Sequence, residues 1–200
     1  MSGPAVVVVA RAPADELAAT LLARTQAWAR DAAPGADYLA VTRSPDASDA
    51  PAAPPPAERR LALHGDPLGA GAMEAAATVF ATGHAPLLLV TAECPSLAAW
   101  HATAALDDLA AGCDLVIGPV VDGGWYLIGL ARPIPELAEL PADSWHTPDV
   151  MALATAAARA AGLEVGLLRP ERRLVSAGDI RAALADPLTP DDVRAVLPRD

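Results

Sequence analysis

A carboxylate follows the segment that most clearly predicts a strand. Pro86–Thr91 has the sequence Pro-Leu-Leu-Leu-Val-Thr, and Glu93 comes two residues later. A carboxylate at the end of a strand is well placed to hold Mg²⁺ or Mn²⁺, which take oxygen ligands and bridge phosphates. A loop carboxylate or a cap for the following helix fits the same spacing, so both interpretations stay open. Cys94 fits a small buried residue better than a nucleophile, because no His–Asp partner set accompanies it.

A second group of residues that could take part in binding or catalysis lies within Gly118–Gly129. Asp122 is followed by Gly123 and Gly124, and glycines allow positive φ angles and close approach of a ligand to the backbone. Trp125 and the tyrosine after it offer flat surfaces on which a base or a sugar could stack. A tight turn with core aromatics explains the glycines equally well, but it gives no reason for the adjoining Gly-Pro pair.

Several familiar motifs are excluded. The glycine-rich turn Gly65–Gly71 is no P-loop, because no lysine follows, and no dinucleotide fingerprint, because Glu74 stands where the third glycine belongs. The chain has no Gly-x-Ser-x-Gly elbow, which disfavours an α/β-hydrolase. The histidines have no pair at metal-ligand spacing on one helix and fit surface or packing roles; they are His64, His84, His101 and His146.

The elements that must position these residues alternate between strands and helices. Continuous apolar runs are typical of strands buried on both faces, and leucines at helical spacing indicate helices. The predicted strands are Ala5–Ala10, Tyr38–Thr42, Arg60–His64, Pro86–Thr91, Asp114–Ile117, Trp125–Leu130 and Glu164–Leu168. The predicted helices are Asp15–Arg30, Ala72–Thr82, one capped by Ser96 and ending near Ala111, one from Thr147 or Asp149 to Ala161, and short ones from Gly178 and Pro190.

This alternation predicts an α/β fold of three layers, in which helices cover both faces of a mostly parallel sheet. Ligands of such sheets bind beyond the carboxyl ends of the strands. We therefore expect Arg11–Pro13, Glu93–Pro95 and Val121–Gly124 to lie near one another.

Length and composition restrict the class of protein. The 200 residues, of which 53% are hydrophobic, suit a single domain over residues 1–200, with an exposed Pro-rich loop at 44–57. The net charge of −11, with arginine as the basic residue throughout, argues against binding to nucleic acid or to an anionic membrane. No signal peptide or membrane span is predicted, and two cysteines without a C-x-x-C motif suggest reduced thiols in the cytoplasm.

Four segments resemble a bacterial family of unknown function in the glycosyltransferase-A superfamily, which contains nucleotide-diphospho-sugar transferases. The family's hallmarks are Asp-Cys-Pro-Asp-Leu after a strand and Gly-Pro-x-x-Asp-Gly-Gly-Tyr-Tyr-Leu-x-Gly. This chain has Glu-Cys-Pro-Ser-Leu at Glu93–Leu97 and Gly-Pro-Val-Val-Asp-Gly-Gly-Trp-Tyr-Leu-Ile-Gly at Gly118–Gly129. The family's Gly-x-Leu-Gly turn is similar to Gly65–Gly69, which has one extra residue, and its Trp-Ser-Thr is similar to Trp145–Thr147.

The resemblance implies a Rossmann-like GT-A fold that binds a nucleotide or nucleotide-sugar together with Mg²⁺ or Mn²⁺ and transfers a glycosyl or nucleotidyl group. It implies catalytic roles for Asp122 and Glu93, and metal binding by Glu93 and Asp179. The substrate-binding residues that it implies are Arg11, Gly65, Gly69, Gly123, Gly124, Trp125 and Trp145.

The chain departs from the family at residues that carry the chemistry. The basic Gly-x-x-Lys-Thr-Arg-Leu loop after the first strand is missing, Glu93 replaces the metal-site Asp, and Ser96 replaces the second Asp of that motif. The family's Asp-x-Asp-Thr-x-x-Asp corresponds to Arg173–Asp179, where two of the three acids are gone. Arg173 could therefore bring a positive charge to the metal's place and let an anion bind without metal. A solvated Arg173, left by drift, is the alternative.

Two functions follow from these observations. The first is a transferase that acts on a nucleotide-activated substrate, with the acids near a metal and the diphosphate, and with Arg11 on a phosphate. The second is a degenerate homologue that binds a ligand or a protein partner without catalysis and needs no metal. A homodimer could form through Trp100 or the Pro-rich loop.

Overall fold

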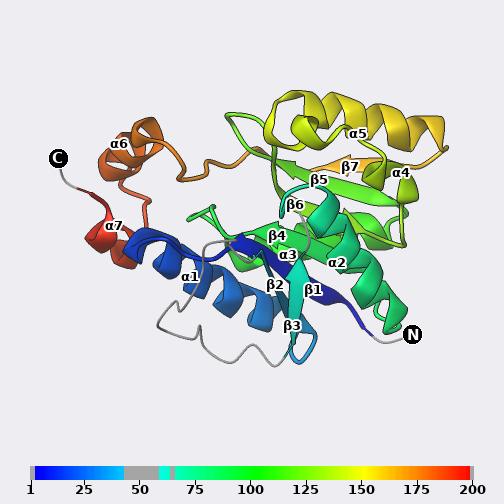
Figure 1. Ribbon diagram of the computed structural model, residues 1–200, viewed down its shortest axis with the longest axis horizontal. Coiled ribbons are helices and arrows are strands. Elements are labelled where there is room, and N and C mark those ends of the chain that lie inside the picture. The colour runs from blue at the N-terminus through cyan, green and yellow to red at the C-terminus, as the bar shows by residue number, and fades with distance from the viewer. Residues whose placement is uncertain (1–2, 43–58, 64–65, 199–200) are drawn as a thin grey trace.

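The computed structural model describes residues 3–42, 59–63 and 66–198, in which strands and helices alternate along most of the chain (Figure 1). The strands are β1 Ala5–Arg11, β2 Asp37–Thr42, β3 Arg60–Leu63, β4 Leu87–Thr91, β5 Leu115–Pro119, β6 Trp125–Leu130 and β7 Val165–Leu167. The helices are α1 Glu16–Ala32, α2 Ala70–Ala81, α3 Ala99–Ala110, α4 Pro135–Ala138, the 3-10 helix η1 Ala142–His146, α5 Asp149–Ala160, α6 Ala177–Ala185 and α7 Asp191–Val196.

The strands form one sheet in the order β3-β2-β1-β4-β6-β5-β7. All neighbouring pairs are parallel except those of β6, which runs antiparallel to both β4 and β5. The reversal follows from the connection between β5 and β6, because five residues suffice for a hairpin but not for the crossover that parallel strands need. The prediction of an α/β fold with a mostly parallel sheet is confirmed.

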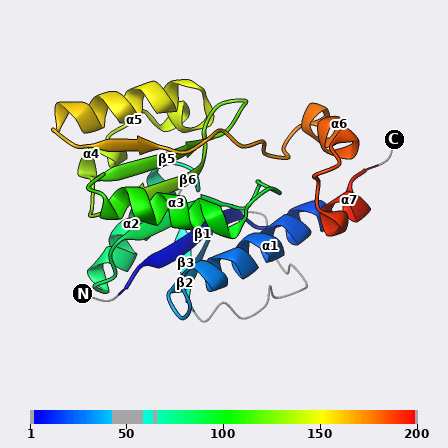
Figure 2. The ribbon, with the colours of Figure 1, turned by 180° about the vertical axis from the view of Figure 1, so that it is seen from behind.

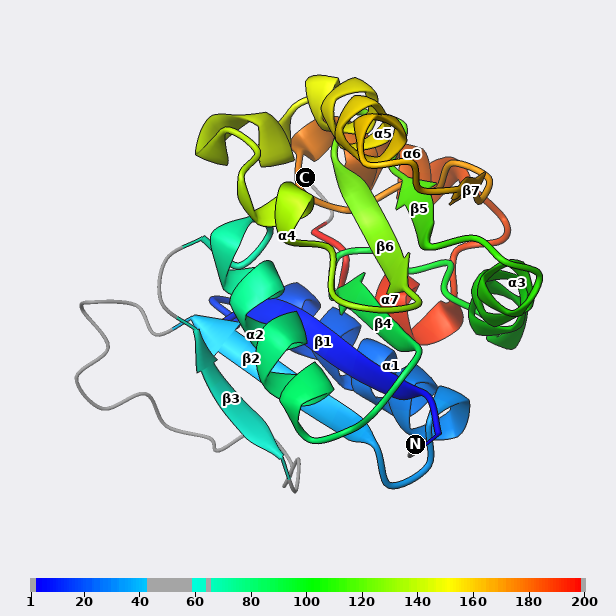
Figure 3. The same cartoon turned by 90° about the vertical axis from the view of Figure 1, so that its right-hand side faces the viewer.

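Helices cover both faces of the sheet. On one face α1 contacts β1 and β2, and α3 contacts β5, β6 and β7. On the other face α2 contacts β1, β3 and β4, while α5 contacts β5 and β7. Figure 3 shows α3 and α2 on opposite sides of the central strands. Because both faces are covered, every residue of β4 and β6 is buried, which explains their continuous apolar sequences.

The C-terminal helices pack separately from this core. α6 and α7 join α1 through a small second cluster of buried residues, made of Leu21, Leu174, Ala183, Val193 and Leu197. An ion pair between Arg24 on α1 and Asp192 on α7, 2.8 Å long, lies beside it. Among the described residues, no helix is long and apolar enough to cross a membrane.

The predicted elements agree with the observed ones to within a few residues, with two exceptions. The helix expected to be capped by Ser96 begins only at Ala99, because the Ser96 hydroxyl donates to Glu171 instead (2.6 Å). The short helices α4 and η1 were not predicted. The Pro-rich loop at 44–57, His64 and Gly65 lie outside the described residues.

Candidate functional site

The site is organised by a segment that crosses the carboxyl end of the sheet. After β7 the chain runs as Arg169–Leu174, here called the crossing segment, toward α6 (Figure 2). Its backbone binds the turn after β5, since the Glu171 N–H donates to the Pro119 carbonyl and the Val121 N–H donates to the Glu171 carbonyl, both at 3.0 Å. It also binds the loop after β4, since the Leu174 N–H donates to the Glu93 carbonyl at 2.9 Å. The crossing segment therefore joins two loops that each carry a predicted acid.

Arg173 bridges these two acids. Its Nε lies 3.1 and 2.9 Å from the two carboxylate oxygens of Asp122, and its Nη1 lies 3.8 Å from Oε2 of Glu93. The Arg173 side chain is only 12% exposed, whereas both carboxylates are partly open to solvent. The structure thus brings Glu93 and Asp122 together around one cation.

A second set of charges lies around Glu93. Arg11, at the end of β1, lies 3.8 Å from Asp66, whose other oxygen is 2.9 Å from Nε2 of His146. Burial raises the pKa of the Glu93 carboxyl above its ordinary value, and the charges of Arg173, Arg11 and His146 only partly offset this. A carboxyl with a raised pKa is a better proton acceptor when ionised, which suits a general base.

A cavity of about 260 Å³ opens beside these charges, between the end of β1, the first turns of α1 and the end of β4. Arg11 and Glu93 line it, together with Asp15, which caps α1 by accepting the Ala18 N–H at 2.8 Å. Asp122 is not among its lining residues and joins the group through Arg173. Most of the remaining wall is apolar and comes from side chains such as Val9, Leu17, Leu22, Leu68 and Leu174.

The glycines and tryptophans of the predicted site form its supporting structure. Gly123 and Gly124 have φ angles of 101° and 90°, so the turn before β6 requires glycine. Trp125 and Trp145 are almost fully buried and pack edge to face, and the Trp125 indole donates to the Leu68 carbonyl at 3.0 Å. A Cβ on Gly69 would lie 2.7 Å from the Trp145 ring. Neither ring presents an exposed face to the cavity, so both hold loops in place.

Asp179, predicted as a metal ligand, is a helix cap in this structure. It lies in the first turn of α6, accepts hydrogen bonds from the Ser176 hydroxyl and N–H, and pairs with Arg172 at 3.4 Å. None of its hydrogen bonds or ion pairs joins it to Glu93 or Asp122. Within the described part of the chain, no group of three His, Cys, Asp or Glu side chains could hold a metal ion.

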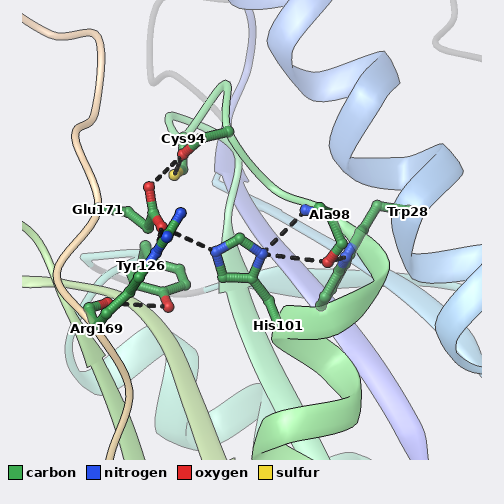
Figure 4. Close-up of polar contacts among 8 residues, drawn as sticks. Trp28, Cys94, Ala98, His101, Tyr126, Arg169 and Glu171 are labelled. Atoms are coloured by element: carbon green, nitrogen blue, oxygen red, sulfur yellow. Dashed lines mark hydrogen bonds and ion pairs between the residues drawn. The ribbon is translucent and has the colours of Figure 1, made fainter. Parts of the chain in front are cut away.

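A buried polar network behind the site was missed in the sequence (Figure 4). Glu171 accepts hydrogen bonds from the Ser96 hydroxyl (2.6 Å), Nε of Arg169 (2.7 Å) and Nε2 of His101 (3.2 Å). Burial opposes the ionisation of Glu171, but these donors outweigh it and hold its pKa below the ordinary value. In the sequence, Glu171 lies between arginines and has the signal of a surface residue.

The histidine and the cysteine of this network, His101 and Cys94, are uncharged at neutral pH. The Ala98 N–H donates to Nδ1 of His101 at 3.0 Å, so the proton resides on Nε2 and points at Glu171, the pattern of a neutral imidazole. Burial lowers the pKa of His101, in agreement with that form. Burial raises the pKa of Cys94 to about 11, so this thiol stays protonated and is no nucleophile at neutral pH.

The chain is similar to several solved structures. One is a nucleotide-diphospho-sugar transferase candidate from Desulfovibrio desulfuricans G20, with 21% identity and a TM-score of 0.76. The alignment covers 98% of this chain and 93% of that one. The chain also matches Rv0371c of Mycobacterium tuberculosis H37Rv, crystallised in complex with manganese, with 17% identity, a TM-score of 0.62 and coverage of 92% and 100% of the two chains. At these identities the likeness establishes the fold alone.

Family membership rests on the sequence. No curated protein matches the chain. A family model does match residues 9–145, a stretch that holds Arg11, Glu93, Asp122, Trp125 and Trp145. The chain therefore belongs to DUF2064, a family described as uncharacterized proteins conserved in bacteria.

Proposed function

We propose that this protein binds a nucleotide-activated substrate, a nucleotide diphospho-sugar, at the cavity beside β1 and β4 and catalyses glycosyl or nucleotidyl transfer. The observation that carries the proposal is the convergence of Arg11, Glu93, Arg173 and Asp122 at the carboxyl ends of the strands. They come from separate segments of the chain, and alternating β and α elements place ligands at this edge. The structural neighbour from Desulfovibrio supports the same class of substrate.

The residues divide the work by charge. Arg11 and Arg173 are the cations available to bind diphosphate oxygens and to stabilise the charge that develops on the leaving group. Glu93, whose pKa is raised by burial, takes the proton of the acceptor's attacking hydroxyl. The apolar wall between α1 and β1 excludes water from the bound group.

A divalent metal does not fit the side chains of the described residues around the site. Glu93 and Asp122 are both ion-paired with Arg173, and Asp15, which also lines the cavity, caps α1. Asp179 caps α6, and His146 pairs with Asp66. The proposed chemistry therefore passes through the arginines and includes no metal-dependent step.

A second function, ligand binding without catalysis, is favoured by the same ion pairs. An arginine that is already paired with both acids stabilises their charged forms in the free site and so reduces their capacity to act as bases. The two functions make the same prediction for binding and opposite predictions for turnover.

Binding is tested by thermal unfolding with nucleoside diphosphates and their sugars, because a ligand of the native state raises the unfolding temperature. We expect at least one of these ligands to raise the unfolding temperature. Arg11→Ala should weaken the affinity for that ligand about tenfold, the equivalent of roughly 1.4 kcal/mol, and should therefore give a smaller shift. Arg159→Ala, an exposed substitution at the end of α5, is the matched control and should bind normally. Absence of any shift across the panel would refute the proposed binding.

Turnover separates the two functions. The nucleotide-sugar that binds is incubated with the protein and a panel of hydroxyl-bearing acceptors. Chromatography follows release of the leaving group, which is the nucleoside diphosphate in glycosyl transfer and the sugar phosphate in nucleotidyl transfer. Release that Glu93→Gln abolishes without loss of binding supports the transferase. Binding without release supports the second function.

A further inference from the structure

The guanidinium of Arg173 lies between Glu93 and Asp122, the two acids predicted to be catalytic. It reaches both oxygens of Asp122 through Nε and approaches Glu93 through Nη1, at 2.9 to 3.8 Å. The Nε–H is shared between the two oxygens of Asp122, so the guanidinium keeps further N–H groups with which it could bind a phosphate.

The position of this guanidinium is fixed by the backbone on both sides. Glu171, two residues before Arg173, is hydrogen-bonded through its main chain to Pro119 and Val121, beside the turn of Asp122. The residue after Arg173 donates its N–H to the carbonyl of Glu93 itself. The Glu171 side chain adds three further hydrogen bonds from Ser96, His101 and Arg169, which anchor the crossing segment to the loop after β4 and to α3 (Figure 4). The arginine is therefore built into the site.

The side chains that could complete a metal site have other partners. Mg²⁺ and similar ions are held in proteins by one or two carboxylates together with water and substrate phosphates, and the two nearest carboxylates, Glu93 and Asp122, are both paired with the guanidinium. Asp179 is bound to Ser176. Asp66 lies 3.8 Å from Arg11 and 2.9 Å from Nε2 of His146, although its Oδ2 accepts no hydrogen bond. The two acids therefore share one fixed monovalent cation, the guanidinium of Arg173.

We propose that Arg173 takes the place of a divalent cation at this site, so that the protein binds its diphosphate ligand without metal. The guanidinium offsets one of the two negative charges of Glu93 and Asp122 in the free protein and offers its remaining N–H groups to phosphate oxygens in the complex. The claim that a diphosphate ligand binds without metal rests on the proposed function, whereas the claim that Arg173 replaces a divalent cation does not. Removal of the guanidinium should accordingly leave two unpaired acids that attract a divalent ion.

The cation is tested with Mn²⁺ alone. Thermal unfolding of wild type should be unchanged by Mn²⁺, whereas Arg173→Asp, which brings a third carboxylate to Glu93 and Asp122, should gain an upward shift that grows with Mn²⁺ concentration. Arg159→Asp makes the same change of charge on an exposed face of α5 and should gain no shift. Circular dichroism without Mn²⁺ shows whether each variant is folded.

Three results would overturn the proposal. In the first, Mn²⁺ stabilises wild type as strongly as Arg173→Asp, because the guanidinium would then not exclude the ion. Another is a folded Arg173→Asp variant that Mn²⁺ leaves unchanged. If Arg173→Asp does not fold, Arg173→Ala takes its place, and a folded Arg173→Ala without any Mn²⁺ shift counts equally against the proposal.

The ligand is tested with a nucleoside diphosphate that stabilises wild type. Its shift should be the same in EDTA and in Mn²⁺ for wild type, but should require Mn²⁺ for Arg173→Asp. A wild-type shift that disappears in EDTA overturns metal-free binding. If no nucleotide binds, the proposed function fails, while the Mn²⁺ experiment still decides the role of Arg173.

Discussion

Glu171 is the residue on which the geometry of the site depends most, although it is behind the cavity. It is 7% exposed and accepts hydrogen bonds from three side chains on two segments of the chain. A buried carboxylate of this kind is tolerated only when donors compensate its lost hydration. Its contribution is to fix the crossing segment, and with it Arg173, rather than to touch a ligand.

Substitution of Glu171 by glutamine should measure this contribution. Glu171→Gln keeps the size but loses the charge, and we expect a loss of about 2 kcal/mol in the free energy of unfolding, as for hydrogen bonds to charged groups. Urea unfolding at neutral pH gives the value. Glu139→Gln, which removes an exposed carboxylate after α4, is the control and should change stability little.

The same pair of variants predicts a pH dependence. The pKa of Glu171 in the folded state lies below its ordinary value of 4.5, so its stabilising effect is complete above pH 4.5 and is lost as the pH falls through the folded pKa. The stability difference between wild type and Glu171→Gln should therefore shrink below pH 4.5. A difference that stays constant to lower pH would show that the charge of Glu171 is not what stabilises the network.

At the scale of elements, local pattern was enough to predict the strands but not their arrangement. The apolar runs at β1, β4 and β6 show burial on both faces, but this burial is the same for parallel and antiparallel neighbours. The direction of β6 was open to prediction from its connection to β5, which is too short for a crossover.

Only part of the site could be predicted from the sequence, and the reason is physical. Arg11 ends a strand, Glu93 and Asp122 each follow one, and the topology of the sheet brings such positions to one edge. Glu171 and Ser96 follow no comparable rule, because the hydrogen bond between them joins residues 75 positions apart. Ser96 has the local signal of a helix cap, and a non-local partner overrides that signal.

The turn between β5 and β6 allows backbone strain to be separated from steric contact. Gly123 has φ of 101°, and a Cβ there would lie 2.6 Å from Pro148, whereas Gly112 has φ of 113° and open space around it. We expect Gly112→Ala to cost about 1 kcal/mol from strain alone. Gly123→Ala should cost more, roughly 3 kcal/mol, because a contact is added to the strain. Equal losses in urea unfolding would mean that Pro148 moves aside freely.

At the scale of the whole molecule, two hydrophobic clusters of unequal size share helix α1. The large one covers both faces of the sheet, and the small one joins α1 to α6 and α7. Few buried apolar contacts and a separate cluster are the features of a unit that opens independently of the global unfolding transition. Since the crossing segment leads directly into α6, this unit lies next to the site.

Val193 on α7 is fully buried in the small cluster and offers a test of that independence. Val193→Ala should cost roughly 2 kcal/mol through the cavity that it leaves, and the loss should appear locally. In hydrogen exchange, amides of α6 and α7 and the amide of Leu174, which is bonded to Glu93, should exchange faster, while those of β1 and β4 keep their protection. Val150→Ala, a matched substitution in the large core, should instead speed exchange throughout the sheet if opening there is global. If Val193→Ala also speeds the exchange of the amides of β1 and β4 to the same extent, the C-terminal helices unfold together with the sheet. The unit next to the site would then not open independently.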